Sequence, residues 1–164
     1  MVPGGDNVAP ARALEAAFRR IAHGPMAGLA VHHPRLRVEA LDARLWSGRW
    51  LTVLITPWCM NLVLLPATAG PWCAGSGQER LFYKFPAGDF AFLSGAEAEV
   101  GEYQSCSLFS TMGEFPDQES ARATAVAALD ALLRPPAAAQ PACATREPSQ
   151  PSRRAFLSAG MAKG

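Results

Sequence analysis

Charged side chains are scarce in this 164-residue chain. Asp, Glu, Lys and Arg make up 18% of the residues, against about 25% in an ordinary domain, and the formal net charge is +1. A net charge this small argues against the clustered basic face that a nucleic-acid-binding protein needs. The length suits one domain with a sizeable core, and the 14 glycines and 14 prolines favour a loop-rich α+β domain over a helical bundle.

The common motifs of metal binding and catalysis are also missing. The chain has no P-loop, no G-x-G-x-x-G turn, no G-x-S-x-G elbow and no H-E-x-x-H helix. No carboxylate or cysteine lies at short spacing beside His32 and His33, which favours solvated histidines over a metal site. The cysteines form no C-x-x-C pair and match no zinc spacing, so we expect reduced, mostly buried thiols at Cys59, Cys73, Cys106 and Cys143. We therefore expect no enzyme, cofactor or metal, although a cysteine–histidine pair formed in space stays an open alternative.

The N-terminal residues lack the pattern of a signal peptide, and no stretch of the chain has that of a membrane-spanning helix. The first ten residues are polar and rich in Gly and Pro, with no basic start and no apolar segment, which predicts a cytoplasmic protein. The most apolar run, residues 51–66, is shorter than the roughly 20 apolar residues of a spanning helix and is interrupted by Pro57. We expect no stable membrane insertion.

That apolar run, LTVLITPWCMNLVLLP, is the most informative stretch of the chain. Two β-type segments, residues 51–55 and 62–65, flank a hinge over residues 56–61. A corner between strands usually takes Gly, Asn, Asp or Ser, but this hinge presents Trp58, Cys59, Met60 and Asn61. Two interpretations follow: the large side chains plug the end of a core, or they form a recognition patch for a partner.

Sequence patterns predict a helix at each end of the domain and strands between them. Leu14, Phe18 and Ile21 share one face of a helix over residues 11–22, and Asp117 is a candidate N-cap for an alanine-rich helix that runs to about Leu133. Strands are expected over residues 36–41, 51–55, 62–65, 80–85, 90–93 and 100–105, with a hairpin turn at Ser47 and Gly48. A second apolar corner, residues 106–112, follows the last strand. The predicted fold class is α+β: a mostly antiparallel sheet of five or six strands packed with the two helices in two layers.

Composition divides the chain into three parts. Residues 1–9 are expected to be a flexible leader, residues 10–134 the folded domain, and residues 135–164 a disordered Pro/Ala-rich tail. The tail ends in an S-R-R-A-F-L segment, which resembles the twin-arginine export motif through Arg153, Arg154, Phe156 and Leu157. Its position is wrong for a signal, so accidental similarity in a basic tail is one interpretation.

Three segments together resemble the HybE/HupJ/HoxT family of nickel–iron hydrogenase assembly chaperones. They are TPWCMNLVLLP at residues 56–66, FPAGDFAF at 85–92 and GEYQSCSLFSTM at 101–112, and the closing alanine-rich helix agrees with them. The chain departs from the usual family forms at Cys59, where an aromatic residue is more common, and at Thr111, where proline is usual.

The resemblance implies a cytoplasmic, non-enzymatic chaperone without a cofactor. Its partners would be hydrogenase small and large subunit precursors, with other maturation factors, and it would hold back twin-arginine export until cofactor insertion is complete. An adaptable apolar surface suits that role, and the candidate partner-binding residues are Trp58, Cys59, Met60, Asn61, Trp72, Cys106, Phe109 and Met112.

Three other hypotheses stay open beside this one. Cys59 or Cys106 could carry iron or a metal ligand during hydrogenase maturation, or Cys106 could act with a histidine in an enzyme. The S-R-R-A-F-L tail could occupy, in cis, a groove meant for a client's export signal.

Overall fold

The computed structural model describes residues 8–67, 72 and 79–135. The predictions on the leader up to residue 7, on Cys73 and Cys143, and on the tail segment with Arg153, Arg154, Phe156 and Leu157 lie outside the described residues. The chain divides after Arg134, and the described helices and strands lie in the unit that ends there.

Helix α1 (Val8–His23) is the predicted N-terminal helix, although it includes the last two residues of the expected leader. Leu14 is completely buried and Phe18 is 9% exposed, so the predicted apolar face is the packed one. After His23 the chain turns back on itself, with Gly24 N donating to Arg20 O at 3.0 Å and Met26 N to Ile21 O at 3.0 Å.

The sheet has seven strands, and all of its pairings are antiparallel. Its order is β1-β3-β4-β7-β6-β5, with β2 also paired to β3. The strands are β1 (Glu39–Ala40), β2 (Arg44–Trp46), β3 (Arg49–Ile55), β4 (Met60–Pro66), β5 (Arg80–Phe85), β6 (Gly88–Glu97) and β7 (Gly101–Phe109). The α+β class with a mostly antiparallel sheet is confirmed. The expected five or six strands become seven because β1 and β2 each pair with a different part of β3.

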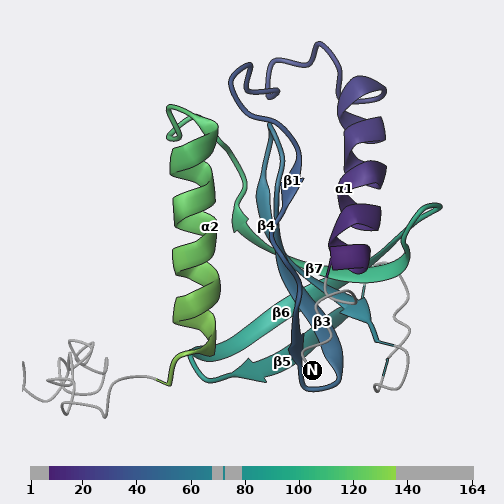
Figure 1. Ribbon diagram of the computed structural model, residues 1–164, viewed down its shortest axis with the longest axis vertical. Helices are drawn as coiled ribbons and strands as arrows, with labels where there is room; N and C mark the ends of the chain where they lie inside the picture. Colours follow the sequence, from purple (N-terminus) through teal and green to yellow (C-terminus); the bar gives the residue numbers. More distant parts are fainter. Residues whose placement is uncertain (1–7, 68–71, 73–78, 136–164) are drawn as a thin grey trace, which may run out of the picture. The chain divides into compact units, whose positions relative to one another are not determined.

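The two helices cover opposite faces of the central β3–β4 hairpin (Figure 1). On β3, Leu51, Val53 and Ile55 pack on the side of α2 (Gln118–Leu133), whereas Leu54 belongs to the core under α1. Both strands are therefore buried on both sides, which explains an apolar run without alternation. This region has three layers, so the two-layer prediction was wrong.

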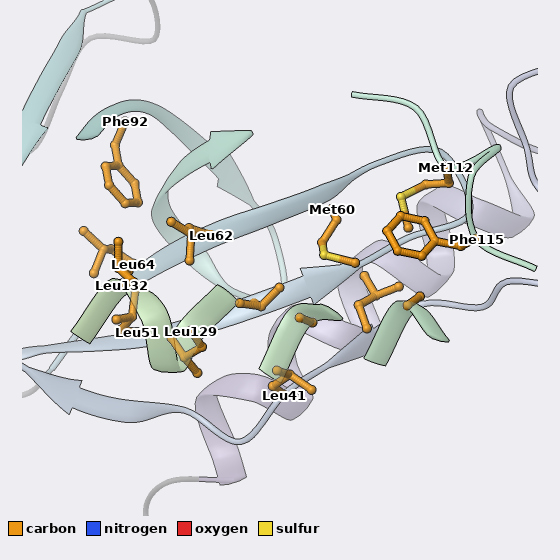
Figure 2. Packing of buried hydrophobic residues seen from close by; sticks show 14 of the residues in the cluster. Leu41, Leu51, Met60, Leu62, Leu64, Phe92, Met112, Phe115, Leu129 and Leu132 are labelled. Carbon is orange, nitrogen blue, oxygen red and sulfur yellow. The ribbon is translucent and has the colours of Figure 1, made fainter. Parts of the chain in front are cut away.

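The larger of the two cores lies between the sheet and α2 (Figure 2). Four residues of the predicted inner face of α2 are buried: Ala121, Ala125, Leu129 and Leu132. Asp117 caps this helix as predicted, with its carboxylate accepting from Ser120 N at 2.8 Å. In Figure 2 Met60, Met112 and Phe115 lie together at one end of this core, and Phe92, Leu64 and Leu132 lie at the other.

Of the predicted strands only β5 has the expected bounds; β3 and β4 are each longer by two or three residues, and β1, β6 and β7 differ as follows. Strand β6 does not end at Ser94 and Gly95, because Gly95 lies under the ring of its cross-strand partner Tyr103 and a Cβ there would come within 2.7 Å of it. Strand β7 continues to Phe109, so most of the expected second corner is strand. Strand β1 comprises only Glu39 and Ala40 of the predicted residues 36–41.

Candidate functional site

The turn between β3 and β4 is organised by the side chain of Thr56. Its buried hydroxyl donates to Cys59 O at 2.9 Å and accepts from Cys59 N at 2.9 Å and Trp58 N at 3.3 Å. The backbone adds a bond from Thr56 N to Cys59 O at 2.9 Å. A threonine hydroxyl can close a turn in this way without glycine or asparagine. The hinge predicted from the sequence is therefore a fixed turn.

This turn holds Trp58 partly exposed beside the loop that follows α1. The Trp58 ring lies 6.1 Å from the ring of His32, centroid to centroid, and packs on the edge of the α1-side core. The loop and the turn are joined by a hydrogen bond from His33 N to Pro57 O at 2.8 Å. Cys59 and Asn61 are also partly buried, and their side chains are hydrogen-bonded to each other. Trp58, Cys59 and Asn61 together are called the turn surface below.

The two described cysteines are free and partly buried, and burial makes their thiols harder to ionise. Burial raises the pKa of the Cys59 thiol, although hydrogen bonds with the side chains of Thr56 and Asn61 oppose this rise. Burial also raises the pKa of Cys106. Activated thiolates require the opposite shift, so neither thiol has the environment of a catalytic nucleophile.

Met60 and Met112 do not contribute to a surface. Met60 is 0% exposed and Met112 is 2% exposed, and both belong to the core beneath α2. Placing them on a partner-binding surface was wrong, because Met60 is the first residue of β4 and its side chain points to the α2 side. For these two residues the core-plug interpretation is the correct one.

The remaining predicted residues lie in separate places. Phe109 on β7 is the register partner of Met60 on β4, and its ring centroid lies 5.1 Å from that of Phe115. Phe109 and Cys106 both pack on the α2 side of the sheet. Trp72 donates from Nε1 to Glu102 Oε2 at 2.9 Å, near the start of β7, whereas Phe109 ends that strand. The sheet thus separates the turn surface from Cys106 and Phe109, and the two apolar corners do not form one patch.

A cleft of about 370 Å³ adjoins the turn surface. Its walls come from the end of α1, the following loop, the segment before β1, and the β3–β4 turn. The lining residues are Arg19, Ala22, His23, Ala27, Gly28, His32, Leu36, Arg37, Val38 and Pro57. Pro57 and His32 connect the cleft directly to Trp58.

Sequence reasoning missed several residues that build this site. Thr56 was assigned to the hinge without a role. The pattern that could have revealed its role is a threonine in a turn that lacks glycine, three residues before the residue whose backbone its hydroxyl bonds. His32 was expected to be solvated, but it lies against Trp58. Arg37 lies within the strand expected over residues 36–41, and its place in the cleft depends on long-range packing that no local pattern shows.

Within residues 8–67, 72 and 79–135, no group of three or more His, Cys, Asp or Glu side chains is arranged to hold a metal ion. In the same residues, no helix combines the length and the apolar character needed to cross a membrane.

The fold is shared with a solved structure. The solution structure of HybE from Escherichia coli superposes with a TM-score of 0.66 at 29% sequence identity, covering 80% of this chain and 82% of that one. The class of protein that the fold defines is a HybE-like α+β domain.

The sequence comparisons define the family. The sequence profile described as NiFe-hydrogenase assembly chaperone HybE matches residues 9–159. Hydrogenase expression/formation protein HupJ of Bradyrhizobium diazoefficiens is 39% identical over 157 residues, which cover 94% of this chain and 90% of that protein. Protein HoxT of Cupriavidus necator is 40% identical over 169 residues, with the same two coverages. The chain belongs to the HybE family of nickel–iron hydrogenase assembly chaperones, a family of assembly factors rather than of known enzymes.

Proposed function

We propose that this chaperone acts in the cytoplasm by binding immature hydrogenase subunits, the signal-bearing small subunit precursor, the large subunit, or both. Binding delays twin-arginine export until cofactor insertion is complete. The observation that carries the proposal is the turn surface: Trp58 is held partly exposed by the fixed turn at Thr56, within the segment that carries the family resemblance. Partly exposed tryptophans on rigid supports are common anchors of protein interfaces.

The chemistry of the described thiols supports binding rather than metal transfer. A carrier of iron or a metal ligand needs thiolates that converge on the metal. Cys106 packs on the α2 side of the sheet, whereas Cys59 precedes Met60 in the turn and lies on the other side with Asn61. Both thiols have raised pKa values. These two cysteines therefore suit a carrier poorly.

The test is a pull-down of the intact chain from cells that express the hydrogenase genes. We expect the wild-type chain to recover a subunit precursor with its export signal uncut, and Trp58→Ala to lose it. Phe82→Ala is the matched control, because Phe82 is 71% exposed on β5, away from the turn. Thermal unfolding of all three proteins checks that they are folded.

The outcomes separate the role from the site. Equal recovery by the wild-type and Trp58→Ala chains would remove Trp58 from the interface and leave the chaperone role intact. Failure of the wild-type chain to recover any hydrogenase subunit would overturn the proposed function itself.

A further inference from the structure

The cleft beside Trp58 is lined by basic side chains and by no acidic one. Of its ten lining residues two are arginines and two are histidines, and none is a carboxylate. We propose that this cleft binds an acidic side chain carried within an apolar segment of a client protein. This inference rests on the proposed function, because it names the chemistry of the segment that the chaperone would hold.

Arg37 provides the most available positive charge in the cleft. Its side chain is 70% exposed, and its guanidinium is 3.9 Å from Glu39, beyond ordinary hydrogen-bond distance. Glu39 is already engaged, since it pairs with Arg122 at 2.8 Å and accepts from Gln118 Nε2 at 2.8 Å. Arg19, by contrast, forms an i,i+4 ion pair with Glu15 on α1. An incoming carboxylate would therefore meet Arg37 first.

The cleft also has an apolar floor. Ala22, Leu36 and Val38 are 8%, 5% and 2% exposed, and Pro57 closes one side. An apolar floor beneath a cationic rim fits a ligand that carries one negative charge on an otherwise apolar body, because each part then meets a matching surface.

The size of the cleft points to a protein segment rather than a whole small molecule. Its volume of about 370 Å³ is near the lower limit of small-ligand sites and accommodates one or two side chains. Apolar surface continues outside it on the same loop, where Leu29 and Val31 are 48% and 61% exposed, and on Trp58 of the turn surface. A chain that places one acidic residue in the cleft can thus lay its apolar neighbours on these residues.

The same charges disfavour one occupant. A pair of arginines from a twin-arginine signal would meet Arg19 and Arg37 in this cleft. Like charges repel, so the cleft disfavours an arginine pair relative to an acidic residue.

The test uses blocked pentapeptides as probes, with the full chain labelled with ¹⁵N for NMR titration. The probes are acetyl-Ala-Leu-Asp-Leu-Phe-amide and its versions with Asn or Lys in the central position. We expect the Asp peptide to shift the amides of Ala27, Gly28 and Arg37 and to bind about fivefold more tightly than the Asn peptide, which is the effect of a partly exposed charge pair. The Lys peptide is expected to bind most weakly.

Charge reversal provides the decisive variant. Arg37→Glu should reverse the order of the Asp and Lys peptides, and its exposed side chain makes a folding defect unexpected. Arg80→Glu, an equivalent charge change at an exposed position of β5, should keep the wild-type order. Ala27→Trp, which fills the mouth of the cleft, should abolish the shifts without changing the net charge.

Each result of this test decides the proposal. Equal binding of the three peptides, an order unchanged by Arg37→Glu, or no shifts at millimolar peptide would overturn it. The assay contains no hydrogenase subunit, so its failure is distinct from failure of the pull-down. If the pull-down recovers a precursor but the peptides show no charge preference, the proposed function stands and the inference of an acidic segment is wrong.

Discussion

Replacing Thr56 by valine tests whether one hydroxyl organises the β3–β4 turn. Valine has the shape of threonine, and residue 56 is fully buried, so the change removes the hydroxyl and little else. The variant loses a hydrogen bond donated to Cys59 O and two accepted from Cys59 N and Trp58 N, together with the 3.3 Å contact to Cys59 Sγ. The backbone bond from Thr56 N to Cys59 O remains.

The expected cost follows from these contacts. Each hydrogen bond contributes about 1 kcal/mol net, less for the 3.3 Å bond to Trp58 N, and the partly buried N–H of Cys59 is left without its acceptor. We therefore expect Thr56→Val to lower the free energy of unfolding by about 2–3 kcal/mol. In a domain of this length the midpoint temperature of unfolding, Tm, should fall by roughly 10 °C.

The assay is equilibrium unfolding in urea, followed by tryptophan fluorescence and by circular dichroism. Thr124→Val is the matched control, because Thr124 donates only one local bond, to Ser120 O at 3.0 Å within α2, and should change stability by less than about 0.5 kcal/mol. Thr56→Ser, which keeps the hydroxyl, should retain most of the stability. A loss below about 0.5 kcal/mol in Thr56→Val would refute the assignment of the turn to this side chain.

Two further predictions follow from buried polar groups. The pKa values of Cys59 and Cys106 are raised, so alkylation of either thiol near neutral pH should be slower than that of an unperturbed cysteine in a short peptide. The rate should increase only as the pH rises through the raised pKa. Fast alkylation at neutral pH would instead support an enzyme that uses a thiolate. Arg49 is 8% exposed, and its guanidinium carbon lies 4.9 Å from the centroid of the Tyr83 ring. Among the described residues no group accepts a hydrogen bond from its Nε. We therefore expect Arg49→Met to leave the Tm of thermal unfolding unchanged or to raise it. A loss above about 2 kcal/mol would show that this cation is needed.

Features set by neighbouring residues could be predicted from the sequence. The hairpin turn at Ser47 and Gly48 requires positive φ, and both residues have it, at 48° and 76°. The cap at Asp117 depends on a contact three residues away. The family resemblance is also carried by contiguous segments, so it was recognisable without the structure.

Features that depend on which face of the sheet a side chain occupies could not be predicted. Met60 and Asn61 are neighbours in β4, yet one is in the α2-side core and the other contacts Cys59 in the turn surface. A register shift between them changes their pairing with β7. The unbroken apolar run from Leu51 did indicate a strand covered on both faces. A strand with one solvated face would alternate apolar and polar residues.

The β3–β4 hairpin belongs to both cores, and this has a consequence for how the domain responds to force. Neither helix can leave the sheet without exposing residues of the same two strands, so the two cores are expected to melt as one cooperative unit. The turn that carries Trp58 joins these strands and is tied to them through Thr56. In the proposed role of Trp58, a bound client would therefore act against the stability of the whole domain rather than against that of a local loop.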